Sequence, residues 1–155
     1  MKFSTREDID APVDAVFDAL CDFERYERAA MRRGVEIRRM DSQGDPGEGA
    51  EWYTRFMMRG RERELSLVVT NFRRAEELVV GLSSQGIAGE ANFELMALSP
   101  NKTRLFVSLE LRPLTLPARL LLKSLKLTKT ALDRRYKDRV SEYIAALHDD
   151  LHDRA

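Results

Sequence analysis

The two histidines of the chain, His148 and His152, have the spacing that comes closest to a metal site. They lie four residues apart near the C-terminal end, with Asp149 and Asp153 beside them, so a helix would place both rings on one face. The pattern lacks the glutamate of a His-Glu-x-x-His motif. Cys21 is the only cysteine, which excludes a cysteine-based metal site and an internal disulfide. We therefore expect a solvated helix end and no bound metal.

Catalytic motifs are missing from this sequence. It has no Ser-His-Asp order and no nucleophile elbow. A few hydroxyl side chains are expected to point inward, but none has a sequence neighbour that would perturb its pKa. Hydroxyl groups alone suit the orientation of a ligand better than proton transfer. These candidates are Thr54, Ser84, Ser124, Thr128 and Tyr136.

A glycine-rich segment from Gly44 to Gly49 is the remaining candidate for polar binding. Backbone amides in such a loop can hold a phosphate. The segment lacks the Gly-Lys-Ser/Thr ending and the following helix that a P-loop requires. A connection between two strands explains it better, and we expect no phosphate site and no cofactor.

Composition favours one globular domain over residues 1–155, since 43% of the residues are hydrophobic. The 26 basic and 26 acidic side chains cancel, so no overall field attracts nucleic acid, and none is expected as a partner. The N-terminal segment is charged and lacks the apolar region of a secretory signal. The longest apolar run, Leu120–Leu122, is far shorter than the ~20 residues of a membrane span. We expect a cytoplasmic protein of bacterial type.

Apolar and polar residues alternate with a period of two from Val35 to Leu111 and, more loosely, over Lys2–Ile9. This period predicts about seven antiparallel strands. The clearest hairpin turns at Gly60-Arg61, with glycine first as in a type II′ turn. The predicted pairs are Phe56 with Leu65, Thr54 with Leu67, and Trp52 with Val69. A second hairpin, with a three-residue loop at Pro100–Lys102, is predicted to pair Phe93 with Leu109 and Leu95 with Val107.

Helical spacing of apolar residues predicts two short helices after the first strand and one long helix at the C-terminal end. The long helix is expected to run without interruption from Pro117 to about His152, because no glycine or proline follows Pro117. With the strands, this order predicts an α+β fold.

The segment from Ile9 to Tyr26 reads IDAPVDAVFDALCDFERY. It resembles the opening strand, the Ala-Pro helix start and the Asp-Phe-x-x-Tyr helix joint of the Bet v 1-like superfamily, also called the START-like or polyketide cyclase/dehydrase group (SRPBCC). The Gly44–Gly49 loop and the polar turn at Ser99–Arg104 are similar to the family as well, and the element order agrees over nearly the whole chain. After Tyr26, where relatives often continue with Pro and Trp, this chain has Glu27-Arg28-Ala29. The departure concerns the mouth of a cavity.

This resemblance implies a helix-grip fold, in which a curved antiparallel sheet wraps a long C-terminal helix around a cavity for an apolar small molecule. It implies no single activity, since relatives include lipid and hormone binders, aromatase/cyclases and chaperone-associated domains. We expect inward-facing residues of the sheet and the long helix to line the cavity. They are Trp52, Thr54, Phe56, Leu67, Val69, Leu82, Phe93, Leu95, Val107, Leu109, Leu125, Thr128, Leu132 and Tyr136.

Three functions remain open at this point. The first is binding or transport of a hydrophobic small molecule such as a lipid, an isoprenoid or a polyketide-like ring. The second is an aromatase/cyclase-type enzyme, and the third is a protein-interaction module. An apolar cavity with only hydroxyls would favour the carrier, a buried charge or imidazole would favour the enzyme, and a packed interior would favour the module.

Basic residues outnumber acidic ones along the predicted C-terminal helix. Lys123, Lys126 and Lys129 are candidates for transient contact with an anionic membrane surface. A solvated outer face, balanced by acids elsewhere, explains the same charges. The oligomeric state has no sequence signal.

Overall fold

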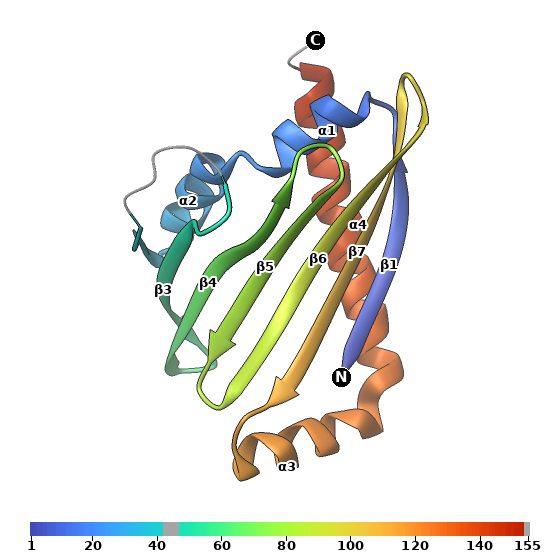
Figure 1. The fold of residues 1–155 in the computed structure, drawn as a ribbon. Coiled ribbons are helices and arrows are strands. Elements are labelled where there is room, and N and C mark those ends of the chain that lie inside the picture. Colours follow the sequence, from blue (N-terminus) through green and yellow to red (C-terminus); the bar gives the residue numbers. More distant parts are fainter. Residues whose placement is uncertain (42–46, 154–155) are drawn as a thin grey trace.

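A computed structural model describes residues 1–41 and 47–153, and one curved sheet dominates that part of the chain (Figure 1). Its seven strands are antiparallel and follow the order β1-β7-β6-β5-β4-β3-β2. Strand register shifts within β4 and β6, and such bulges bend the strands that carry them. The strands are β1 (Lys2–Ile9), β2 (Glu36–Arg39), β3 (Glu51–Met58), β4 (Arg61–Arg73), β5 (Glu77–Ser84), β6 (Ile87–Ser99) and β7 (Lys102–Pro113).

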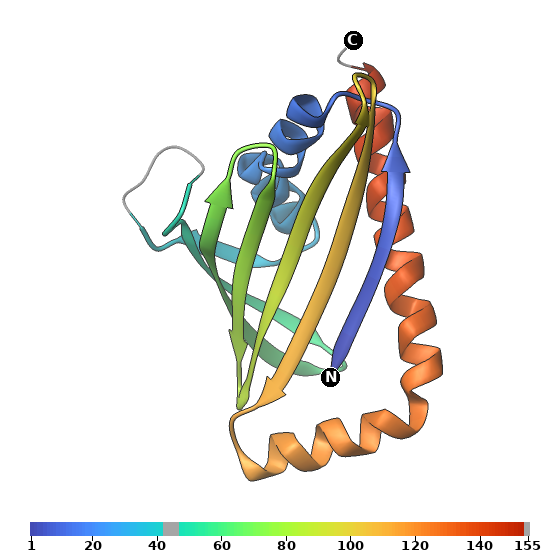
Figure 2. The same cartoon turned by 45° about the vertical axis from the view of Figure 1, so that its right-hand side comes forward.

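Helices cover the concave side of this sheet. α4 (Lys129–Asp153) runs beside β1, and α1 (Val13–Leu20) packs on α4. α2 (Phe23–Arg32) lies next to β2. α3 (Leu116–Leu125) crosses the opposite end of the sheet, between the end of β7 and the start of α4 (Figure 2). The expected helix-grip arrangement of a curved sheet, two short helices and a long C-terminal helical segment is confirmed.

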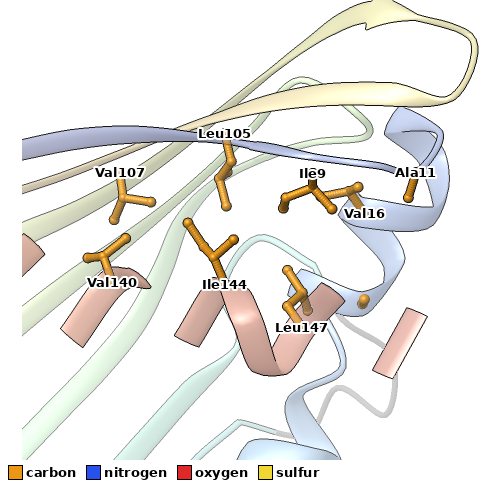
Figure 3. Close-up of a cluster of buried hydrophobic side chains, with 9 residues drawn as sticks. Ile9, Ala11, Val16, Leu105, Val107, Val140, Ile144 and Leu147 are labelled. Atoms are coloured by element: carbon orange, nitrogen blue, oxygen red, sulfur yellow. The ribbon is translucent and has the colours of Figure 1, made fainter. Parts of the chain in front are cut away.

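Two clusters of buried side chains hold the helices on the sheet. In the first, Val140 and Ile144 of α4 point toward Leu105 and Val107 of β7 (Figure 3). Val140, Ile144 and Leu147 follow the i, i+4, i+7 spacing of one helix face. The second cluster joins α1 to the middle strands through Phe17, Leu20, Trp52, Val69 and Leu78.

The hairpin between β3 and β4 differs from its predicted register. It turns at Arg59-Gly60, with Met58 opposite Arg61, and both turn residues have positive φ (54° and 75°), as a type I′ turn requires. A positive φ is uncommon for arginine, so the sequence favoured the glycine-first turn. The predicted partners are each wrong by two residues, which preserves the faces. The observed pairs are Trp52 with Leu67, Thr54 with Leu65, and Phe56 with Arg63.

The hairpin between β6 and β7 is also two residues from the prediction. Phe93 pairs with Val107 and Leu95 with Leu105. Ser99 lies opposite Lys102, which leaves a two-residue loop, and the register shifts between Ala97 and Ser99. The bulge supplies the extra residue that keeps the apolar faces together, so the predicted three-residue loop is wrong.

The C-terminal helix is interrupted, contrary to prediction. A 3₁₀ turn, Lys126–Thr128, separates α3 from α4. The hydroxyls of Ser124 and Thr128 donate to the backbone carbonyls of Leu121 and Leu125, three residues earlier. Hydroxyls that compete in this way for helix carbonyls bend helices.

We expect Gly86→Ala to destabilise the fold by about 1–3 kcal/mol more than Gly60→Ala. Both glycines have positive φ (71° and 75°), so alanine is strained at either site by about 1–2 kcal/mol. A Cβ at Gly86 would lie 2.6 Å from Thr115 Oγ1, at the start of α3, whereas Gly60 has nothing within 4 Å. Chemical denaturation of both variants measures the difference. Equal losses would show that α3 does not press on the β5–β6 turn.

Candidate functional site

A cavity of about 490 Å³ lies between the concave face of the sheet and the helices α1, α2 and α4. Its wall is almost entirely apolar, and it is partly open to solvent. This volume is in the range of sites that hold drug-sized ligands. The lining residues are Leu20, Phe23, Tyr26, Glu27, Ile37, Trp52, Leu67, Leu78, Val80, Ala91, Phe93, Val107, Ser108, Leu109, Tyr136, Arg139, Val140 and Tyr143.

The structure brings part of the predicted lining together around this cavity. Those that line it are Trp52, Leu67, Phe93, Val107, Leu109 and Tyr136. Thr54 and Val69 are buried elsewhere, and Leu95 packs against the two core clusters. Phe56, Leu82, Leu125 and Leu132 are half-buried outside the lining, and Thr128 is exposed. Strand parity assigns side chains to a face of the sheet, but it does not say how far along each strand the cavity extends.

The joint between α1 and α2 contributes lining residues that the sequence prediction did not include. Phe23 and Tyr26 point into the cavity region from one side of α2, and Glu27 follows them. Their signal was present in the Asp-Phe-x-x-Tyr pattern, whose aromatic residues lie three apart and so share a helix face. From α4, Tyr143 and Arg139 also line the cavity. Arg139 stands at the rim, because 83% of its side chain is exposed.

A pair of phenols forms the main polar feature of the wall. Tyr26 Oη lies 2.9 Å from the carbonyl oxygen of Leu20 and is hydrogen-bonded to Tyr143 Oη. Each hydroxyl has one proton, so when Tyr26 donates to Leu20, Tyr143 is the donor within the pair. The Tyr143 oxygen then keeps acceptor capacity for a ligand. Burial raises the pKa of Tyr143 to about 12 and raises the pKa of Tyr26 as well, which keeps both phenols neutral at pH 7.

Glu27 is the single acidic side chain in the lining, and its carboxylate is hydrogen-bonded to an indole. Trp52 Nε1 donates to Glu27 Oε1 over 2.7 Å. The indole also packs edge-on against the Phe23 ring, with 4.9 Å between the ring centroids. The guanidinium of Arg39 lies 4.8 Å from the centroid of the Trp52 ring. These contacts fix the orientation of Trp52, which leaves its aromatic surface as part of the wall.

The inward hydroxyls expected from the sequence all donate to backbone carbonyls. Thr54 bonds to Leu65 over 2.7 Å, and Tyr136 bonds to Val107 over 2.7 Å. The hydroxyls of Ser84, Ser124 and Thr128 donate to the backbone carbonyls of Glu64, Leu121 and Leu125, respectively. Of these hydroxyl residues only Tyr136 lines the cavity. Burial raises its pKa to about 12.

The histidine pair expected from the sequence lies away from the cavity. The Nε2 atoms of His148 and His152 are 3.0 Å apart, and His148 lies 3.8 Å from Asp10. No group of three or more metal-ligating side chains occurs among residues 1–41 and 47–153. Residues 44–46 of the Gly44–Gly49 loop fall outside the described residues. In the part of the chain that is described, no helix is long and apolar enough to span a membrane.

No protein-family model and no curated protein matches this sequence. Solved structures do match. The Zhui aromatase/cyclase from Streptomyces sp. R1128 aligns over 99% of this chain and 94% of its own, with a TM-score of 0.65 and 12% identity. A START superfamily protein from Mycobacterium smegmatis aligns over 88% and 97%, with a TM-score of 0.56 and 16% identity.

A third match has a different role. An HSP90 activator from Plasmodium falciparum aligns over 71% of this chain and 72% of its own, with a TM-score of 0.50 and 17% identity. At these identities the matches establish the fold and leave the activity open. The chain has the helix-grip fold shared by the Bet v 1-like and START-like proteins.

Proposed function

We propose that this protein binds and carries a hydrophobic small molecule in the cavity beneath α4. The observation that supports this proposal is the combination of a volume of about 490 Å³ with a wall that is almost entirely apolar. Burying apolar ligand surface there contributes about 25 cal/mol for each Å² removed from water. A lipid, an isoprenoid or a polyketide-like ring meets this requirement.

The phenol pair adds one polar preference to this apolar site. With Tyr26 bonded to Leu20 and Tyr143 bonded to Tyr26, the Tyr143 oxygen keeps acceptor capacity for a ligand that reaches it. An apolar ligand with one hydroxyl group therefore suits the site better than a pure hydrocarbon. The charges of Glu27 and of Arg139 at the rim offset each other, so the lining itself selects neither an anionic nor a cationic ligand.

A cyclase-type enzyme is the second candidate, and Glu27 is the observation that favours it. It is a half-buried carboxylate in the cavity lining, the kind of group that a general base requires. Two features favour the carrier instead. Glu27 already accepts a hydrogen bond from the Trp52 indole N–H. The raised pKa values of Tyr143 and Tyr136 keep both phenols neutral near pH 7, which makes them poor proton donors and acceptors. The open interior also argues against a protein-interaction module with a fully packed core.

Filling the cavity should weaken ligand binding. Ala91 of β6 lines the cavity, so Ala91→Phe places a ring in the space that a ligand needs. We expect affinity for a bound lipid or polycyclic compound to fall tenfold or more, since losing two buried CH₂ groups costs about 1.6 kcal/mol. The change in Trp52 fluorescence on titration measures binding.

The matched control is Glu90→Phe, which adds the same ring to the neighbouring exposed position on the strand. It should leave the affinity unchanged, and circular dichroism checks that both variants fold. A wild-type Trp52 signal that stays constant across lipids and aromatic compounds would contradict a working cavity.

Removing the Tyr143 hydroxyl should weaken the binding only of ligands that carry a polar group. One neutral hydrogen bond is worth about 0.5–1.5 kcal/mol, so Tyr143→Phe should lower the affinity for a hydroxylated ligand by about tenfold or less. Its affinity for the matching hydrocarbon should not change. Tyr53→Phe, which alters a phenol outside the cavity lining, is the control for both ligands. Equal losses for the two ligands would mean that Tyr143 acts through packing.

Mass spectrometry of the ligand separates carrier from enzyme. Glu27→Gln keeps an oxygen that can accept the hydrogen bond of the Trp52 indole N–H, but it removes the basic carboxylate. For a carrier, the ligand should emerge unchanged from both the wild type and this variant. Conversion by the wild type that falls ~10²-fold or more in Glu27→Gln would establish the enzyme in its place.

A further inference from the structure

Helix α3 has two apolar faces, and the described structure covers only one. Ala118 and Leu122, one turn apart, are buried. Leu116 and Leu120 are also one turn apart but lie almost opposite on the helix circumference, where they are 67% and 60% exposed. In the 3₁₀ turn that follows, Leu127 is 89% exposed. Isolated exposed leucines are ordinary, but a row along one helix face marks an interaction surface.

The cations beside this face have no acidic partners. The sequence contains no aspartate or glutamate between Glu110 and Asp133. Arg119, Lys123 and Lys126 are exposed and form no ion pair with any residue among 1–41 and 47–153. Lys129 differs, since it bonds to Asp133 over 2.7 Å and its Nζ lies 4.5 Å from the centroid of the Phe3 ring. The uncompensated charge therefore flanks the exposed leucines directly.

The helix is formed and anchored without any partner. The Leu114 amide donates to the Gly86 carbonyl over 2.7 Å, and Thr115 Oγ1 caps the Ala118 amide over 3.3 Å. Both figures show α3 lying across one end of the molecule, away from α1 and α2 (Figures 1 and 2). A preformed helix at the end of the body can meet a flat surface along its length.

We propose that α3 and the following 3₁₀ turn dock on an anionic membrane surface. Leu116, Leu120 and Leu127 enter the boundary between headgroups and acyl chains, and Arg119, Lys123 and Lys126 contact the anionic headgroups. An exposed apolar stripe beside basic side chains is the signature of a helix that lies in the membrane interface. The positive charge selects anionic over neutral lipid. The leucines favour a bilayer over an acidic protein, which would need only the charges.

Vesicle co-sedimentation of the full chain tests this surface. The wild type should bind phosphatidylcholine vesicles that contain phosphatidylglycerol, should bind pure phosphatidylcholine vesicles far less, and should be released by salt. Each cation removed should weaken binding about fivefold, so Lys123→Gln/Lys126→Gln should lose about 25-fold. Leu116→Ser/Leu120→Ser should lose tenfold or more.

The control Arg134→Gln/Lys137→Gln removes the same charge from exposed positions on α4 and should change vesicle binding much less. Equal loss in this control would overturn the proposal, as would no binding to anionic vesicles. Leucine-dependent self-association without vesicle binding would assign the face to a second copy, and capture by polyglutamate that ignores the leucine change would assign it to an acidic protein. The Trp52 response should stay intact in all variants, so this test fails or succeeds independently of the cavity's function.

Discussion

The packing of α4 against one side of the sheet is the contact on which the rest of the structure depends. Val140, Ile144 and Leu147 bury themselves against β7, the end of β1 and α1. A helix is only about 10 Å wide, whereas seven strands at about 4.8 Å spacing form a much wider surface. One helix therefore cannot cover the concave face. α1 and α2 close part of the remainder through the Phe17 cluster, and the uncovered part is the cavity.

Polar groups in and around the cavity bond within the protein before any ligand arrives. Tyr136 donates to Val107, Tyr26 donates to Leu20, and the Trp52 indole donates to Glu27. Cys21, behind the wall, is a buried thiol whose pKa burial raises to about 12, so it is a poor nucleophile. A wall satisfied in this way offers shape and apolar area first, with one acceptor at Tyr143. This chemistry suits retention of a ligand better than its conversion.

Periodicity predicted the fold because alternation and helical spacing report burial directly. It grouped Trp52, Leu67 and Phe93 on one inner face, and these three residues line the cavity although both hairpin registers were two residues out. The strand registers depended on two local backbone features that residue types do not predict, a positive φ at Arg59 and a bulge near Leu98. The limits of the cavity depended on tertiary contacts from α2 and α4. For that reason Phe56 and Leu132 were grouped with the lining although they lie outside it.

The bend at Lys126–Thr128 links the interior to the surface of α3. Without glycine or proline, the sequence favoured a straight helix with Leu125 on the face toward the sheet. The bend instead sends α3 across the end of the sheet, so that Ala118 and Leu122 are buried while Leu116 and Leu120 face solvent. Exposed leucines contribute almost nothing to folding, because their apolar area stays in water. Their cost is a tendency to associate, which the neighbouring Lys123 and Lys126 oppose through charge repulsion between copies. The same lysines would attract a surface of opposite charge, so the membrane docking that we propose would use the side chains that oppose self-association.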